Sequence, residues 1–73
     1  MPKLPRITAA QAIKVVKKYG FKLVRQSGSH KIFRKGTQRI TIPYHAGKIL
    51  HPKIVKNIID TLEISNEEFI KNL

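Results

Sequence analysis

His30 is the side chain of this sequence best placed for acid–base chemistry. It stands in the run GSHKIF at residues 28–33, where a turn composition gives way to a short apolar strand. Residue type alone also fits an ordinary surface histidine. An imidazole is the common biological acid–base group near neutral pH, and on a surface that attracts polyanions it supplies the minimum equipment for cutting RNA.

The charge of the chain is divided unevenly along its length. Residues 1–59 carry 14 of the 15 Lys and Arg and no acid, whereas residues 60–73 carry one Lys and four acids. These net charges of +14 and −3 account for the total of +11. An acid-free stretch of this length favours a polyanionic partner over a face charged only for solubility. The cations expected to follow a phosphate backbone lie on or beside the predicted strands; they are Lys22, Arg25, Lys31, Arg34, Lys35 and Arg39.

Other candidate residues have two interpretations each. Gly28 suits a hairpin turn and also lets an RNA backbone come close, and Ser29 fits either a phosphate contact or a turn cap. His45 is as compatible with a second acid–base group as with an exposed loop residue. Tyr44 fits base stacking and core packing equally. His51 is expected to cap the second helix or to stack nearby, with no role in the chemistry.

Length and composition limit the possible functions. Seventy-three residues make a single domain, residues 1–73, with little room for an enclosed active site. The absence of cysteine excludes thiolate zinc sites and fits a reducing cytoplasm. No apolar run is long enough to span a membrane. The histidines lack a metal-ligand spacing, so neither a metal nor another cofactor is expected.

Local signals predict a helix, three strands and two helices. Thr8 and Gln11 fit a capping box at the start of the first helix, and Gly20 suits its end. Short turns between consecutive strands predict an antiparallel meander, and Pro52 marks the start of the second helix. Ser65 is expected to cap a short last helix. The expected bounds are residues 9–19 for the first helix and 21–26, 30–34 and 39–42 for the strands. Apolar stripes on these helices predict a two-layer α+β domain.

The sequence leaves open which face of the middle strand is buried. In a strand, His30 and Ile32 share one face while Lys31 and Phe33 share the other. Each face therefore carries an apolar residue next to a cation or an imidazole.

Several segments together resemble the HicA family of mRNA interferase toxins. They are the first helix ending KYGF at residues 18–21, QSGSH at 26–30, IPYH at 42–45 and the tail LEISNEEF at 62–69. The resemblance covers nearly the whole chain. The loop AGKIL at residues 46–50, which leads into His51, departs from the family pattern.

The resemblance implies a fold similar to double-stranded-RNA-binding domains and a HicB-type antitoxin as partner. It also implies that His30 is the catalytic residue of a metal-independent endoribonuclease that cleaves mRNA. The basic and turn residues expected to contact RNA are Lys22, Arg25, Gly28, Ser29, Lys31 and Arg34. The alternative from another functional class is a non-catalytic RNA-binding module of the same fold.

Overall fold

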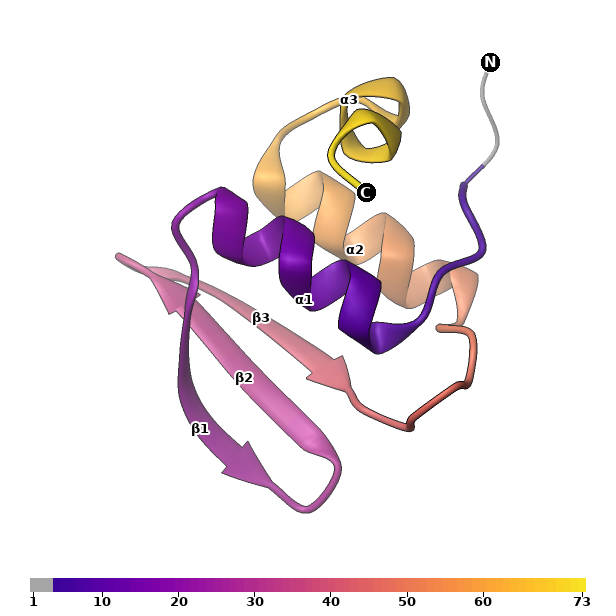
Figure 1. The fold of residues 1–73 in the computed structure, drawn as a ribbon. Helices are drawn as coiled ribbons and strands as arrows, with labels where there is room; N and C mark the ends of the chain where they lie inside the picture. The colour runs from indigo at the N-terminus through magenta and orange to yellow at the C-terminus, as the bar shows by residue number, and fades with distance from the viewer. Residues whose placement is uncertain (1–3) are drawn as a thin grey trace.

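Two helices cover one face of a three-stranded antiparallel sheet, and a third, short helix lies above them in the view of Figure 1. The structure, a computed structural model, describes residues 4–73. The strands pair in the order β1-β2-β3. The predicted α+β arrangement of helix, meander and helices is confirmed. The elements are α1 (Ala9–Lys18), β1 (Lys22–Ser27), β2 (His30–Lys35), β3 (Gln38–Pro43), α2 (Pro52–Leu62) and α3 (Asn66–Lys71).

Side-chain caps fix where the helices begin. The Thr8 backbone N–H donates to Gln11 Oε1 at 2.9 Å and the Gln11 N–H donates to Thr8 Oγ1 at 3.4 Å, which confirms the predicted capping box. His51 Nδ1 accepts from the Lys53 N–H at 3.0 Å, so this histidine is the cap of α2, as predicted. Each cap satisfies a backbone donor that the first helical turn leaves without a partner.

Glycine-led turns of two residues set the register of the sheet. Gly28 has φ 58° and begins the turn between Ser27 and His30. Gly36 has φ 59° and begins the equivalent turn between β2 and β3. A positive φ at the first central position matches the twist of the flanking strands, which favours Gly there.

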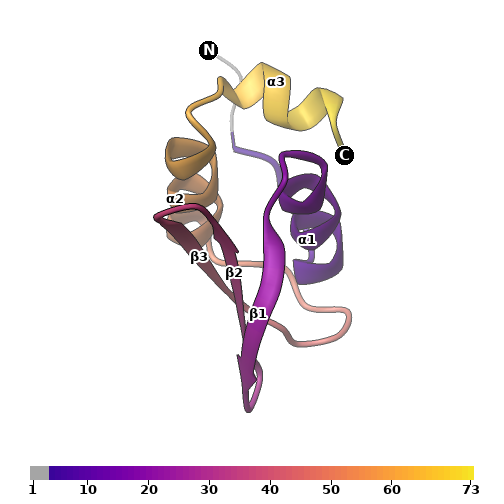
Figure 2. The ribbon, with the colours of Figure 1, turned by 90° about the vertical axis from the view of Figure 1, so that its left-hand side faces the viewer.

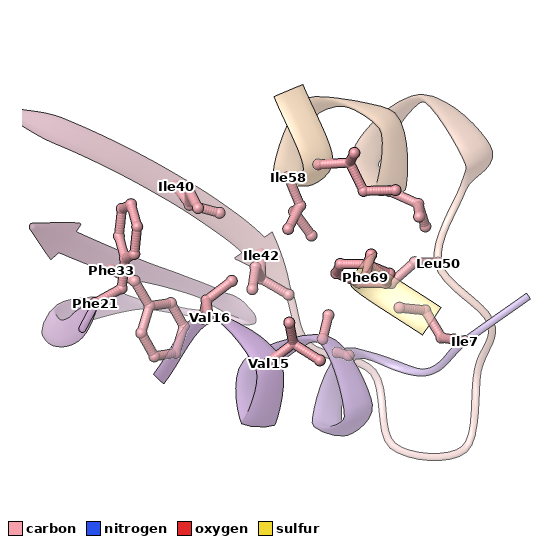
Figure 3. Packing of buried hydrophobic residues seen from close by; sticks show 14 residues of the cluster. Ile7, Val15, Val16, Phe21, Phe33, Ile40, Ile42, Leu50, Ile58 and Phe69 are labelled. Atoms are coloured by element: carbon pink, nitrogen blue, oxygen red, sulfur yellow. The ribbon is translucent and has the colours of Figure 1, made fainter. Parts of the chain in front are cut away.

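The register decides which face of β2 is buried. Phe33 pairs with Ile40 in β3, and both side chains lie in the core with Ile42. Figure 3 shows these side chains gathered between the sheet and the helices. His30 and Ile32 therefore lie on the other side of the sheet. The buried cluster consists of Ile7, Ala9, Ala12, Val15, Val16, Phe21, Phe33, Ile40, Ile42, Leu50, Val55, Ile58, Ile59 and Phe69.

The strand bounds differ from the predicted ones in physically understandable ways. Phe21 is buried before the ladder begins, so β1 starts at Lys22. The register of β1 shifts between Leu23 and Arg25, which marks a β-bulge. Pro43 is the last residue of β3 and pairs with His30, because proline is tolerated at a strand end on a sheet edge.

Candidate functional site

His30 is held at one end of the sheet by hydrogen-bonded neighbours on both sides. It is the first residue of β2 and pairs with Ser27 in β1 and with Pro43 in β3. Its side chain is exposed. The Ser29 carbonyl accepts from the Tyr44 N–H at 2.6 Å, which fixes the turn before His30 against the segment after β3. The backbone of this candidate site is thus positioned by all three strands, while the imidazole stays open to a ligand.

We call the side of the sheet turned away from α1 and α2 the open face. Its side chains include Lys22, Arg25 and Ser27 from β1, His30, Ile32 and Arg34 from β2, and Arg39 and Thr41 from β3. Lys22 pairs with Arg34, and Arg34 pairs with Arg39, so three cations form one row across the sheet. Like charges in directly opposite positions destabilise a sheet. A row of this kind therefore favours a surface that binds an anion.

A shallow groove crosses the open face beside this row. It combines guanidinium groups with apolar side chains, and it is lined by Val24, Arg25, Ile32, Arg34, Thr37 and Arg39. Arg34 Nε donates to the Gly36 carbonyl at 2.9 Å, which holds this guanidinium over the turn. Arg34 is four residues from His30 along β2, or about 13 Å. The groove thus continues the surface that begins at the imidazole.

Two of the cations expected beside the open face lie on its reverse side. Lys31 shares the side of Phe33, and its Nζ lies 4.4 Å from the centroid of the Tyr44 ring. Lys35 Nζ donates to the Tyr19 carbonyl at 2.8 Å, at the end of α1. Lys35 therefore stabilises the helix terminus and lies on the helix side of the sheet, apart from Lys22, Arg25 and Arg34. The other RNA-binding residues predicted in the strands, Lys22, Arg25 and Arg34, share one face with His30, and Gly28 and Ser29 form the turn before it.

The segment between β3 and α2 carries the other two histidines and begins after Pro43, the residue that pairs with His30. His45 and Lys48 line a second groove with His51, the cap of α2. This segment is tied to the chain before α1, because the Leu50 N–H donates to the Ile7 carbonyl at 2.8 Å. His45 is exposed, which leaves it accessible for chemistry without assigning it any.

Tyr44 is partly withdrawn from this surface. Its ring is half-buried and packs against the core cluster, with the Lys31 ammonium over one face. Core packing and a cation–π contact therefore account for this side chain.

The acidic groups lie away from His30. Glu67 and Glu68 occupy the first turn of α3, and Figures 1 and 2 show α3 and the β1–β2 turn at opposite ends of the molecule. Asp60 Oδ2 accepts from Lys56 Nζ at 3.3 Å on the exposed side of α2. The acids of α3 are therefore separated from the end that holds His30.

Among residues 4–73, no group of three or more His, Cys, Asp or Glu side chains could hold a metal ion. Within the same range, no helix is long and apolar enough to cross a bilayer.

Comparison with models of known protein families shows which family the chain belongs to. The family model of the HicA toxin of bacterial toxin–antitoxin systems matches residues 9–64, from the first residue of α1 to just beyond α2. The chain belongs to the HicA toxin family. No curated protein matches it. The family match includes the turn, the strands and the loop that form the candidate site, so the exposed histidine and its basic face lie within the region that defines this HicA toxin.

Proposed function

We propose that this HicA toxin is a metal-independent endoribonuclease that cleaves mRNA in the cytoplasm and is neutralised by a HicB-type antitoxin. The observation that carries the proposal is the exposed imidazole of His30 at the end of a cationic sheet face, in a member of this toxin family. An imidazole in this position reaches a bound strand without any opening of the fold.

In the proposed reaction, His30 takes the proton of a ribose 2′-hydroxyl, and the 2′-oxygen attacks the adjacent phosphorus. The bond to the 5′-oxygen breaks, and that oxygen takes up a proton. The products are a 2′,3′-cyclic phosphate and a 5′-hydroxyl. His45, which lines a groove with Pro43, is the candidate proton donor for the leaving oxygen.

The remaining residues bind and orient the strand in this proposal. Arg25, Arg34 and Lys22 contact successive phosphates along the open face, and their charge stabilises the anionic transition state. Gly28 and Ser29 lie against the reacting nucleotide, where the missing Cβ of Gly28 lets the RNA backbone approach. Lys31 contributes from beside Tyr44 at the edge of the site.

Replacing His30 by Ala tests the catalytic assignment. The variant is expected to lose RNA cleavage and growth inhibition while its circular dichroism and thermal unfolding stay close to those of the parent, because the side chain is exposed. Ile70→Ala, an exposed substitution in α3 away from the open face, is the matched control and should keep full activity. Cleavage at the parental rate by the His30 variant would reject the assignment.

Cleavage in a chelator, together with the chemical nature of the RNA ends that it leaves, tests metal independence. Cleavage should continue in excess EDTA and leave 2′,3′-cyclic phosphate ends, detectable by mass spectrometry of a short RNA. Activity that disappears in EDTA and returns with Mg²⁺ would reject the proposed reaction. A parent protein that binds RNA with the open face but cleaves none under any condition would instead be the RNA-binding module of the alternative interpretation.

A further inference from the structure

β1 forms one edge of the sheet, and nothing in residues 4–73 pairs with its outer side. β1 is the first strand in the order β1-β2-β3, so it has a hydrogen-bonded neighbour on one side only. All six of its residues are exposed. Figure 2 views the molecule from this side, and β1 lies in front of the helices. Its outward peptide groups are therefore accessible.

β3 forms the opposite edge of the sheet. α2 packs close to β3, and Gln38 Nε2 donates to the Thr61 carbonyl in α2 at 3.1 Å. β3 ends in Pro43, which has no backbone N–H to donate to a further strand. β1 contains no proline and is therefore the better acceptor of an added strand.

Two large apolar side chains of β1 are exposed, one on each side of the sheet: Leu23 pairs with Phe33 on the helix side, and Val24 lines the groove of the open face. Leu23 is 46% exposed and Val24 is 57% exposed. The bulge between Leu23 and Arg25 falls at these residues, with Lys22 before them and Arg25 after them. Each side of this edge therefore offers an exposed apolar side chain, and a cation stands before and after the pair in sequence.

The outward backbone groups favour a peptide over a nucleic acid. Residues that flank a two-residue turn exchange both hydrogen bonds, so Ser27 points its N–H and C=O toward β2. Its neighbour Gln26 then points its N–H and C=O away from the sheet. A phosphate only accepts hydrogen bonds, whereas another strand offers a donor and an acceptor together.

The charges argue against self-pairing. A second copy of β1 would bring Lys22 and Arg25 close to their own kind, which destabilises a strand pair. The bulge also interrupts a regular self-complementary ladder. An acidic strand from another protein meets both cations favourably.

We propose that β1 accepts an added strand from a partner protein, with acidic residues beside Lys22 and Arg25 and with apolar residues beside Leu23 on one side of the sheet and Val24 on the other. This mode of recognition combines main-chain hydrogen bonds with side-chain contacts. The inference rests on the proposed function in that the partner is the antitoxin named there.

Hydrogen exchange in the complex with the cognate antitoxin tests the added strand. The Gln26 amide of the free toxin is expected to exchange rapidly and to become protected at least 10-fold in the complex. Val24→Glu should weaken antitoxin binding by at least 10-fold, because it places an acid against an acidic strand. Ile70→Glu is the matched control, since Ile70 is 41% exposed but lies in α3, and it should change affinity less than twofold.

The outcomes separate this inference from the proposed function. An antitoxin that does not bind the parent toxin at all would overturn both. Binding that leaves the Gln26 amide unprotected and tolerates Val24→Glu would overturn the added strand alone. Protection of the same amide by a short RNA without antitoxin would also overturn it, because the edge would then be a nucleic-acid surface.

Discussion

Neighbouring residues in β2 have opposite roles, and the pleat of the strand separates them. His30 and Arg34 belong to the open face, whereas Phe33 is 1% exposed and lies in the core. A change at one position therefore affects the chemistry, and a change beside it affects the stability. The division follows from the period of two residues along a strand.

A pair of alanine substitutions measures this division. Phe33→Ala should lower the free energy of unfolding by about 3–5 kcal/mol, because it removes a buried aromatic side chain. Ile32→Ala, on the half-exposed side, should cost a much smaller amount. Urea unfolding followed by circular dichroism checks both. Equal losses would contradict the assignment of the buried face.

The sequence held enough information to resolve that face. A two-residue turn at Gly36 sets Phe33 opposite Ile40, and the alternation in β3 then places Ile40 and Ile42 on one side. Counting the turn length would have identified the open face and placed Lys31 on the other. Hydrophobicity in β2 alone was ambiguous because Ile32 and Phe33 are both apolar.

At the scale of elements, caps and turns determine how the site is presented. His51 fixes the start of α2 and with it one wall of the groove that holds His45. The hydrogen bond between Ser29 and Tyr44 fixes the turn against the loop. These local contacts explain how a small domain holds an exposed site in a defined position without enclosing it.

The cap role of His51 predicts a specific pattern of rescue. His51→Ala should lower stability by about 1 kcal/mol, the usual cost of removing a helix cap. His51→Asn should recover most of that loss, because asparagine is a preferred cap. Thermal unfolding of the three proteins checks the order. A failure of asparagine to rescue would show that the ring has another structural role.

Prediction was accurate for elements with a chemical signature and weaker elsewhere. The capping box at Thr8 and the proline at the start of α2 are patterns of a few neighbouring residues, so both helices begin where the sequence predicts. The bulge in β1 has no such pattern, because Leu23 and Val24 resemble any strand residues. The role of Lys35 depends on a contact with Tyr19 at the end of α1. The two residues are far apart in the sequence, so no local sequence pattern predicts this contact.

At the scale of the whole molecule, the β1–β2 turn that precedes His30 and the acids of α3 lie at opposite ends (Figure 1). The cations of the open face extend from Arg25 to the row of Lys22, Arg34 and Arg39 beside the β2–β3 turn. An approaching RNA would be attracted to the open face and repelled by the acids of α3. This separation orients the encounter before any specific contact forms.

The salt dependence of RNA affinity tests which cations take part. On a single strand, each phosphate contact contributes about −0.7 to the slope of log affinity against log salt. Arg34→Ala should weaken binding and make the slope shallower by about that amount. Lys35→Ala, the matched control, should leave the slope unchanged because its ammonium is bound to the Tyr19 carbonyl. Equal effects of both would contradict the assignment of the open face as the RNA surface.

The segment that matches the family model is shorter than the segment that contributes to the folded core. The family match ends at residue 64, but Phe69 of α3 is 0% exposed, and Asn72 Nδ2 donates to the Tyr19 hydroxyl at 3.1 Å. Loss of one buried phenylalanine costs about 3–5 kcal/mol, a large share of the 5–15 kcal/mol typical of a whole domain. A truncation placed at the family boundary would therefore remove part of the folding core, and an inactive fragment of that kind would report on unfolding rather than on the location of a site.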